Sequence, residues 1–125
     1  MLNYLQNEYA EYLLKDNIIR ITYKENVTID IEAALQIVKD RVLLHKGQQL
    51  PVLCDARSVN YVTKPARDYL AIEGSILISA VAFVTEPSVI DLFIKMYLRA
   101  SRPPVKTKIF YEITDALQFL EQVLI

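Results

Sequence analysis

Hydrophobic and polar residues alternate in two segments near the start of the chain, residues 9–15 and 18–23. Alternation with a period of two is typical of a β-strand with one buried face. Asp16 and Asn17 separate the two segments, and both residue types tolerate the positive φ angles of a tight turn. The pattern therefore predicts a β-hairpin.

A helical pattern follows the hairpin, because apolar residues recur at intervals of three and four positions. These apolar positions are Ile31, Ala34, Leu35, Val38 and Val42. Thr28 or Asp30 can accept a hydrogen bond as the N-cap, and Gly47 suits the position just after the last turn. We therefore predict the first helix between these residues.

Two continuous apolar runs come next, LPVLCD at residues 50–55 and ILISAVAFVT at residues 76–85. Runs without alternation are typical of central parallel strands that are covered on both faces. The residues after the first run read as a loop up to Thr63. Pro65 then suits the first turn of a short helix over residues 65–73.

Helices and strands continue to alternate in the rest of the chain. The pattern predicts a helix over residues 87–101 that ends before two prolines, a strand over residues 106–111, and a terminal helix capped by Thr114. The element order is then ββαβαβαβα. This order predicts a single α/β domain over residues 1–125, with a mostly parallel sheet and an antiparallel hairpin at its edge.

Composition excludes several functions. Of the 125 residues, 53% are hydrophobic and 23% are charged, as in an ordered globular protein. The net charge of −1 offers no attraction to a polyanion, so we expect no nucleic-acid partner. Gly47 and Gly74 are the only glycines, which is too few for a phosphate-binding glycine loop. We therefore expect no cofactor.

Cys54 and His45 each occur once, so we expect neither an internal disulfide nor a metal site. We expect the Cys54 thiol to be buried with a raised pKa, and His45 to lie exposed near the end of the first helix. The N-terminus lacks the pattern of a signal peptide, which favours a cytoplasmic location. The longest apolar run, residues 75–85, is about half the length of a membrane-spanning helix, so we expect no transmembrane segment.

A group of polar and cationic residues begins where the first apolar run ends. The group contains Asp55, Arg57, Ser58, Asn60, Thr63, Lys64 and Arg67. Open α/β sheets bind ligands at the carboxyl ends of their strands, and the N–H groups of a helix N-terminus attract anions there. One interpretation is a recognition site for a small anion or a partner. The other is a solvated loop in which Thr63 is the helix N-cap.

Several of these residues resemble a known family. Asp55 at a strand end, the turn at residues 58–59 and the apolar pair at residues 61–62 are similar to the order found in STAS domains, the SpoIIAA-like fold of anti-sigma-factor antagonists. The resemblance covers the whole chain in element order, and the wider group includes Sec14-type lipid-binding domains. It implies a SpoIIAA-like (STAS-like) fold and a regulatory module that acts by binding proteins.

The sequence departs from STAS domains at residues 63–66, which read Thr-Lys-Pro-Ala where the family has Asp-Ser-Ser-Gly. Lys64 stands at the position of the serine that family members phosphorylate, so the phosphorylation switch does not carry over. Thr63 offers a neighbouring hydroxyl, and a phosphate there would lie beside Lys64 and Arg67. Modification of Thr63 stays an open alternative to its role as the N-cap.

The helix predicted over residues 87–101 is more apolar than a surface helix needs to be, since an apolar stripe somewhat wider than about 100° is enough to cover a sheet. Its excess apolar face has to be covered by a second copy of the chain, by a ligand or by the chain itself. The candidate contact residues are Val89, Ile90, Phe93, Ile94 and Tyr97. A basic stripe on the same helix, which can meet an acidic group, consists of Lys95, Arg99 and Arg102.

The function we predict is binding without catalysis, because the sequence offers no nucleophile with its base, no metal-ligand set and no cofactor loop. The first hypothesis is a STAS-like regulatory module that associates with proteins, as a homodimer through the helix at residues 87–101. The second hypothesis is a small apolar or anionic amphiphilic (lipid-like) ligand under that helix. The partner, the ligand, the signal and the pathway stay open.

Overall fold

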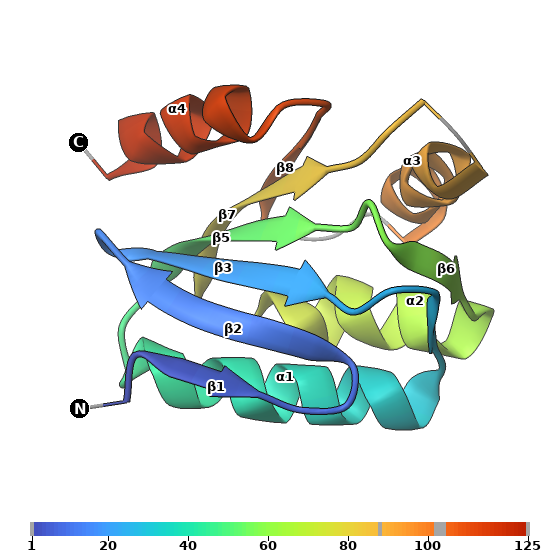
Figure 1. Cartoon of the computed structure of the whole chain (residues 1–125), viewed down its shortest axis with the longest axis horizontal. Coiled ribbons are helices and arrows are strands. Elements are labelled where there is room, and N and C mark those ends of the chain that lie inside the picture. The colour runs from blue at the N-terminus through green and yellow to red at the C-terminus, as the bar shows by residue number, and fades with distance from the viewer. Residues whose placement is uncertain (1, 88, 102–104, 125) are drawn as a thin grey trace.

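The computed structural model describes residues 2–87, 89–101 and 105–124 (Figure 1). Its main feature is a six-stranded sheet in the order β1-β2-β3-β5-β7-β8, beside a small sheet that pairs β4 with β6. The strands are β1 (Tyr4–Gln6), β2 (Ala10–Lys15), β3 (Ile18–Tyr23), β4 (Val27–Ile29), β5 (Leu50–Asp55), β6 (Val59–Val62), β7 (Ile78–Val84) and β8 (Lys106–Phe110). The helices are α1 (Ile31–His45), α2 (Lys64–Ile72), α3 (Val89–Ser101) and α4 (Ile113–Val123), with a short 3-10 helix, η1 (Glu73–Ser75), after α2.

The antiparallel edge of the sheet contains the predicted hairpin. β2 and β3 pair up to Lys15 opposite Ile18. Asp16 and Asn17 connect them with φ angles of 54° and 62°, as a tight turn between twisted strands requires. The hairpin prediction is confirmed.

β1 extends this edge and is absent from the sequence-based prediction. It pairs antiparallel with β2, and the side-chain amide of Asn7 fixes the turn between them, because its Oδ1 accepts hydrogen bonds from the backbone N–H groups of Tyr9 and Ala10. That amide donates to the Tyr12 hydroxyl at 2.8 Å and to the Asp40 carboxylate of α1 at 2.8 Å. A strand of three residues is too short for its alternation to be recognised in a sequence.

The centre of the sheet is parallel and buried. β3 pairs with β5, β5 with β7, and β7 with β8, all in the same direction. Every residue of β5 is buried, and Val52 lies opposite Val81 while Leu53 lies opposite Ala82. The two continuous apolar runs are therefore neighbouring parallel strands, as predicted.

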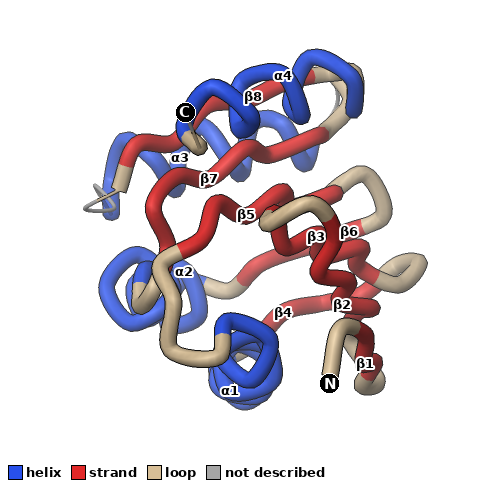
Figure 2. Tube along the Cα trace, turned by 90° about the vertical axis from the view of Figure 1, so that its left-hand side faces the viewer, coloured by secondary structure: helices blue, strands red, loops and turns tan. Residues whose placement is uncertain are grey.

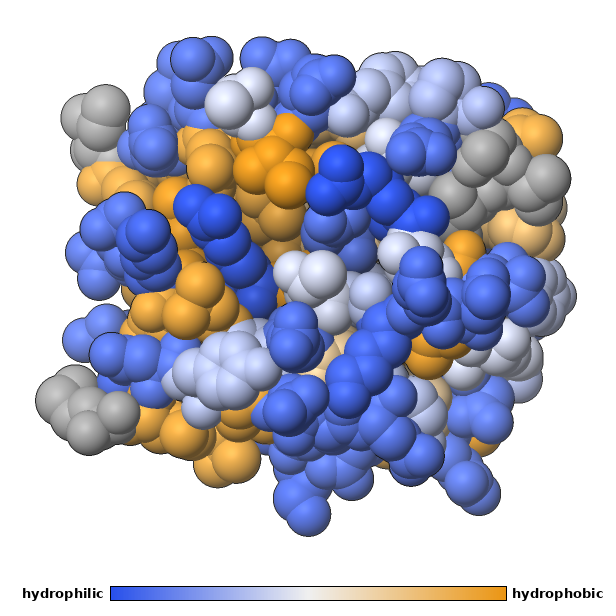
Figure 3. Space-filling model, viewed as in Figure 1, coloured by the Kyte–Doolittle hydropathy of each residue, from blue (hydrophilic) through white to orange (hydrophobic). Residues whose placement is uncertain are grey.

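Helices cover the two faces of the sheet unequally (Figure 2). α1, α2 and α3 lie on one face, and of the described helices only α4 packs on the other, against β5, β7 and β8. Leu53 and Val84 meet Ala116 and Leu120 of α4 in a small core on that side. Figure 3 shows hydrophobic residues gathered between α4 and the β2–β3 hairpin, among hydrophilic side chains, where the outer face is less covered.

The ends of α1 follow local capping chemistry. Asp30 is the N-cap, and its carboxylate accepts a hydrogen bond from the backbone N–H of Ala33 at 2.9 Å. Lys46 and Gly47 then take left-handed φ angles of 53° and 79° and end the helix. Of the two caps that the sequence allows, Asp30 is the one used.

Two local predictions are wrong. Residues 59–62 form β6 and not a loop, because residues 27–29, distant in the sequence, supply a parallel partner. α4 begins at Ile113 after the N-cap Glu112, and Thr114 lies inside the helix. The helix starts earlier than predicted because Ile113 packs into the small core beneath α4.

Shortening Leu120 to alanine tests the packing of α4. The Leu120 side chain is 0% exposed, so we expect L120A to lower the free energy of unfolding by about 2–5 kcal/mol. Urea unfolding followed by circular dichroism measures the loss. The control is L124A at the exposed end of the helix, which we expect to cost less than about 1 kcal/mol. Equal losses in the two variants would contradict this packing.

Candidate functional site

A cavity of about 100 Å³ lies between the sheet and the layer formed by α1, α2 and α3. Its lining is mainly apolar and comes from strands and helices that are far apart in the sequence. The lining includes Ile21, Val52, Cys54, Val81 and Phe83 from the sheet, and Ile37, Arg41, Arg67, Leu70, Phe93 and Ile94 from the helices. The cavity is the candidate site for a ligand.

Strand alternation explains why these residues meet. Neighbouring residues of a strand point to opposite faces of the sheet. Val52, Cys54 and Val81 therefore line the cavity, whereas Leu53 and Ala82 belong to the core beneath α4. Because both faces are covered, both sets of residues are apolar, and the sequence shows continuous runs.

α3 closes one side of the cavity. Phe93 and Ile94 line it, and the Phe93 ring packs edge-on against Tyr61 of β6 with the ring centroids 4.9 Å apart. Pairs of this geometry hold aromatic rings in a fixed orientation. These two residues of the predicted contact face are thus turned toward the interior of the chain. The side chains of Val89, Ile90 and Tyr97 lie outside the described residues.

Arg41 of α1 forms a polar part of the cavity lining, although it is only 2% exposed. Its Nη1 donates to the Ile76 carbonyl at 3.1 Å, and its Nη2 donates to the Gly74 carbonyl at 3.0 Å. Nη1 also contacts Nε2 of His45. These bonds hold the turn before β7, in which Leu77 takes a left-handed φ of 61°. Burial lowers the pKa of Arg41 from its ordinary value.

His45 is buried, with 1% of its surface exposed, so the prediction of an exposed histidine is wrong. The ring lies between the Arg41 guanidinium, which binds the Gly74 carbonyl of η1, and the Gln48 carbonyl after the helix. Arg41 donates to Nε2, and Nδ1 lies 3.0 Å from the Gln48 carbonyl, an arrangement that fits the neutral ring with its proton on Nδ1. Burial, together with the charge of Arg41, lowers the pKa of His45 to about 4.

Cys54 is buried in the wall of the cavity. Burial raises the pKa of its thiol to about 12. A thiol that stays protonated at neutral pH is a poor nucleophile and packs like a small apolar side chain. The prediction of a buried thiol with a raised pKa is confirmed.

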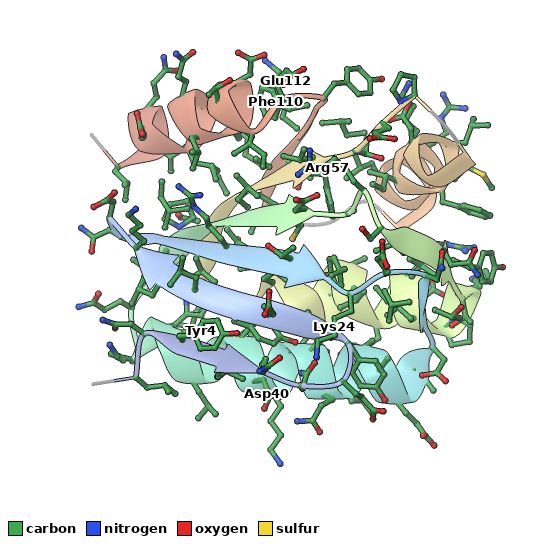
Figure 4. The ribbon with its side chains drawn as sticks, in the orientation of Figure 1. Tyr4, Lys24, Asp40, Arg57, Phe110 and Glu112 are labelled. Carbon is green, nitrogen blue, oxygen red and sulfur yellow. The ribbon has the colours of Figure 1, made fainter. Side chains whose placement is uncertain are left out.

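The polar residues between Asp55 and Arg67 do not all lie on the same side of the sheet. The Asp55 carboxylate accepts hydrogen bonds from Nε of Arg57 at 2.9 Å and from Nη2 at 2.7 Å, and these bonds raise the pKa of Arg57. Arg57 lies on the same side of the sheet as Glu112 at the start of α4 (Figure 4). Arg67 lines the cavity on the opposite face. The sheet thus separates two arginines that are close in the sequence.

The other polar residues of this group serve the local structure. Thr63 is the N-cap of α2, and its hydroxyl accepts a hydrogen bond from a backbone N–H of the first turn at 3.4 Å. Lys64 forms an exposed ion pair with Asp68 at 2.7 Å. Ser58 is half-buried and Asn60 is exposed. The structure thus shows Thr63 as the N-cap. A recognition site at these residues and a modification of Thr63 stay predictions.

The basic stripe on α3 lies apart from the cavity. Lys95 pairs with Asp91 of the preceding turn at 3.0 Å. Arg99 is exposed, and Arg102 lies outside the described residues. Neither Lys95 nor Arg99 lines the cavity, so an acidic group inside it would meet arginines from α1 or α2 instead.

Within the described ranges, no three His, Cys, Asp or Glu side chains gather in a way that could hold a metal ion. None of the described helices combines the length and the apolar character that crossing a membrane requires.

One family of sequences matches most of the chain. The family described as "Domain of unknown function (DUF7793)" matches residues 12–124. The chain belongs to the DUF7793 family. No curated protein matches it.

A solved structure supports the fold of this DUF7793 chain. An uncharacterised protein of the DUF3478 family with a SpoIIAA-like fold, from Shewanella loihica PV-4, superposes with a TM-score of 0.64. The superposition covers 93% of this chain and 98% of that chain at 13% sequence identity, so the similarity concerns the fold. The predicted SpoIIAA-like architecture, which is the fold of STAS domains, is confirmed.

In the DUF7793 chain, Arg41 is a buried residue that was not predicted from the sequence, and His45 is buried where an exposed position was predicted. Arg41 follows Ile37 and Val38 at helical spacing and therefore occupies a position on the apolar face of α1. His45 lies one turn further along the same face. A charged or polar residue at such a position is the signal that would have identified both as buried groups.

The lowered pKa of His45 predicts a stability that depends on pH. Between the ordinary pKa near 6.5 and the folded value of about 4, the unfolded chain binds a proton that the folded chain does not, so stability falls as the pH falls through this window. The neutral variant H45Q has no such proton. We expect the wild type to lose about 2 kcal/mol more than H45Q when the pH falls from about 7 to about 4.5.

Urea unfolding of both proteins across this pH range measures the difference. H45Q is the reference for the wild type, because every other titrating group is common to the two chains. If the free energy of unfolding of the wild type and of H45Q changed in parallel with pH, His45 would not be held neutral by its surroundings.

Proposed function

We propose that this DUF7793 chain is a non-catalytic module that binds a small apolar or amphiphilic molecule between the central strands and the helices α2 and α3. The observation that carries the proposal is the cavity of about 100 Å³. An apolar cavity of roughly 150 Å³ in another protein holds a molecule of the size of benzene. The cavity is therefore suited to the buried part of a small ligand.

The chemistry of the lining supports binding over catalysis. The walls consist mainly of aliphatic and aromatic side chains. The Cys54 thiol in the wall is held protonated. His45 lies behind the lining residue Arg41, and both of its ring nitrogens face hydrogen-bonding partners, Arg41 and Gln48. The single buried cysteine also suits a reducing cytoplasm, and we include that location in the proposal.

Titration with hexanol tests the binding function. We expect the methyl resonances of Val52, Val81 and Leu70 to shift and saturate in NMR spectra of the wild-type chain, because these residues line the cavity. V81F places an aromatic ring in the space and should abolish the shifts. The control V123F adds the same ring on α4, beyond the sheet, and should bind hexanol like the wild type.

Overpacking can unfold a protein, so circular dichroism accompanies each variant. If V81F does not fold, V62F fills the cavity from β6, where Val62 is only half-buried. Cavity-lining methyl groups that do not respond to hexanol in the wild type would rule out the proposed function.

A second candidate function is the association of two copies through α3. Leu92 is 61% exposed and Met96 is 53% exposed, and they lie one helical turn apart. Large apolar side chains exposed next to each other are typical of a contact with another protein. Among the described side chains of α3, this exposed pair is better placed to contact a second copy than Phe93 or Ile94, which line the cavity.

Replacing Leu92 and Met96 together with glutamate tests this association. Because both side chains are exposed, we expect the double variant to fold and to be monomeric where the wild type is dimeric. Light scattering on a sizing column at high micromolar concentration measures the mass. L35E, which changes an exposed leucine of α1, is the matched control and should stay dimeric. A wild type that is monomeric under these conditions would remove this candidate.

A further inference from the structure

The buried charge of Arg41 has no anionic partner in the part of the chain that the structure describes. The ion pairs found there are Arg57 with Asp55, Lys64 with Asp68, and Lys95 with Asp91. Arg41 instead donates to two backbone carbonyls and contacts a histidine. Its guanidinium, which is protonated at any physiological pH, thus brings a positive charge into the interior.

Three titratable groups near Arg41, those of His45, Cys54 and Tyr12, do not compensate this charge at neutral pH. Burial lowers the pKa of His45 to about 4 and raises the pKa of the Cys54 thiol to about 12, so both groups are neutral. Burial also raises the pKa of the Tyr12 phenol. The carboxylate of the adjacent Asp40 is bonded to the turn between β1 and β2.

A purely structural role does not require a charge at this position. The hydrogen bonds to the carbonyls of Gly74 and Ile76 hold the turn before β7, and a neutral amide side chain also offers N–H donors. Burying an unpaired charge costs free energy that a neutral donor avoids. Since Arg41 lines the cavity, an anion that enters the cavity would compensate the charge.

Arg67, the other arginine of the lining, is less suited to this role. It is half-buried, so water already solvates part of its charge, and its Nη1 donates to the Val62 carbonyl at 2.8 Å. Arg67 lies in the first turns of α2, whereas Arg41 lies next to η1 after the last turn of that helix. The two arginines therefore mark different ends of the cavity.

We propose that the ligand is a small anionic amphiphile, and that Arg41 binds its acidic group while Val52, Val81 and Phe93 contact its apolar part. The proposal rests on the binding function proposed above and specifies the class of the ligand. A carboxylate matches the planar set of N–H donors that a guanidinium presents. The apolar walls then determine the size and shape of the remainder.

Three probes with the same hydrocarbon chain test the preference for an anion: hexanoate, hexanol and hexylammonium. Isothermal titration calorimetry with the wild-type chain at neutral pH gives their affinities. We expect hexanoate to bind about tenfold more tightly than hexanol, because a hydrogen bond between charged groups is roughly twice as strong as a neutral one. Hexylammonium should bind most weakly, since its charge repels Arg41.

The variants R41M and R67M show which arginine is responsible for the preference for hexanoate over hexanol. Methionine removes the charge and the N–H donors and keeps an unbranched, although shorter, side chain. We expect R41M to lose the preference for hexanoate while still binding hexanol, and R67M to keep the preference. If R41M does not fold, the Nε–H resonance of Arg41 in the wild type is followed by NMR, and it should shift with hexanoate but not with hexanol.

The outcomes separate the two proposals. Equal affinities for hexanoate and hexanol, a preference lost in R67M but kept in R41M, or an Arg41 resonance that does not respond to hexanoate would overturn the role of Arg41 and leave the binding function intact. If none of the three probes binds the wild type, the binding function fails, and the role of Arg41 fails with it.

Discussion

The parallel pairing of β5 with β7 is the constraint on which the rest of the structure depends. The two strands lie side by side in the middle of the sheet, with Val52 opposite Val81 and Leu53 opposite Ala82. Helices cover both of their faces, so each strand contributes alternate residues to the core beneath α4 and to the wall of the cavity. The candidate site is therefore a direct product of the pairing that stabilises the fold.

The fold could be predicted from the sequence where its signals are local. Asp16 and Asn17 identify the hairpin turn, and the two continuous apolar runs identify central strands before any contact is known. The elements that were missed form only with a partner elsewhere in the chain. β6 needs β4, and β1 needs both β2 and the hydrogen bond from Asn7 to α1. No local pattern encodes such partners.

The candidate site was predictable only in part. The apolar excess of the helix at residues 87–101 pointed to Phe93 and Ile94, which do line the cavity. Nearness in the sequence was misleading for Arg57 and Arg67, because the sheet lies between them. The position of Arg41 on the apolar face of α1 indicates that it is buried. Its hydrogen-bond partners could not be predicted, because the Gly74 and Ile76 carbonyls lie 33 and 35 residues away in the sequence.

The two faces of the central strands pack against different parts of the chain, and this has a consequence for how related chains can diverge. Leu53 and Ala82 are constrained by the shape of α4, whereas Val52 and Val81, their direct neighbours, are constrained by the cavity. Since adjacent residues point to opposite faces, selection can act on one face with little effect on the other. Evolution can therefore adjust what the cavity accepts without rebuilding the terminal helix, and can replace the surface of that helix without altering the cavity.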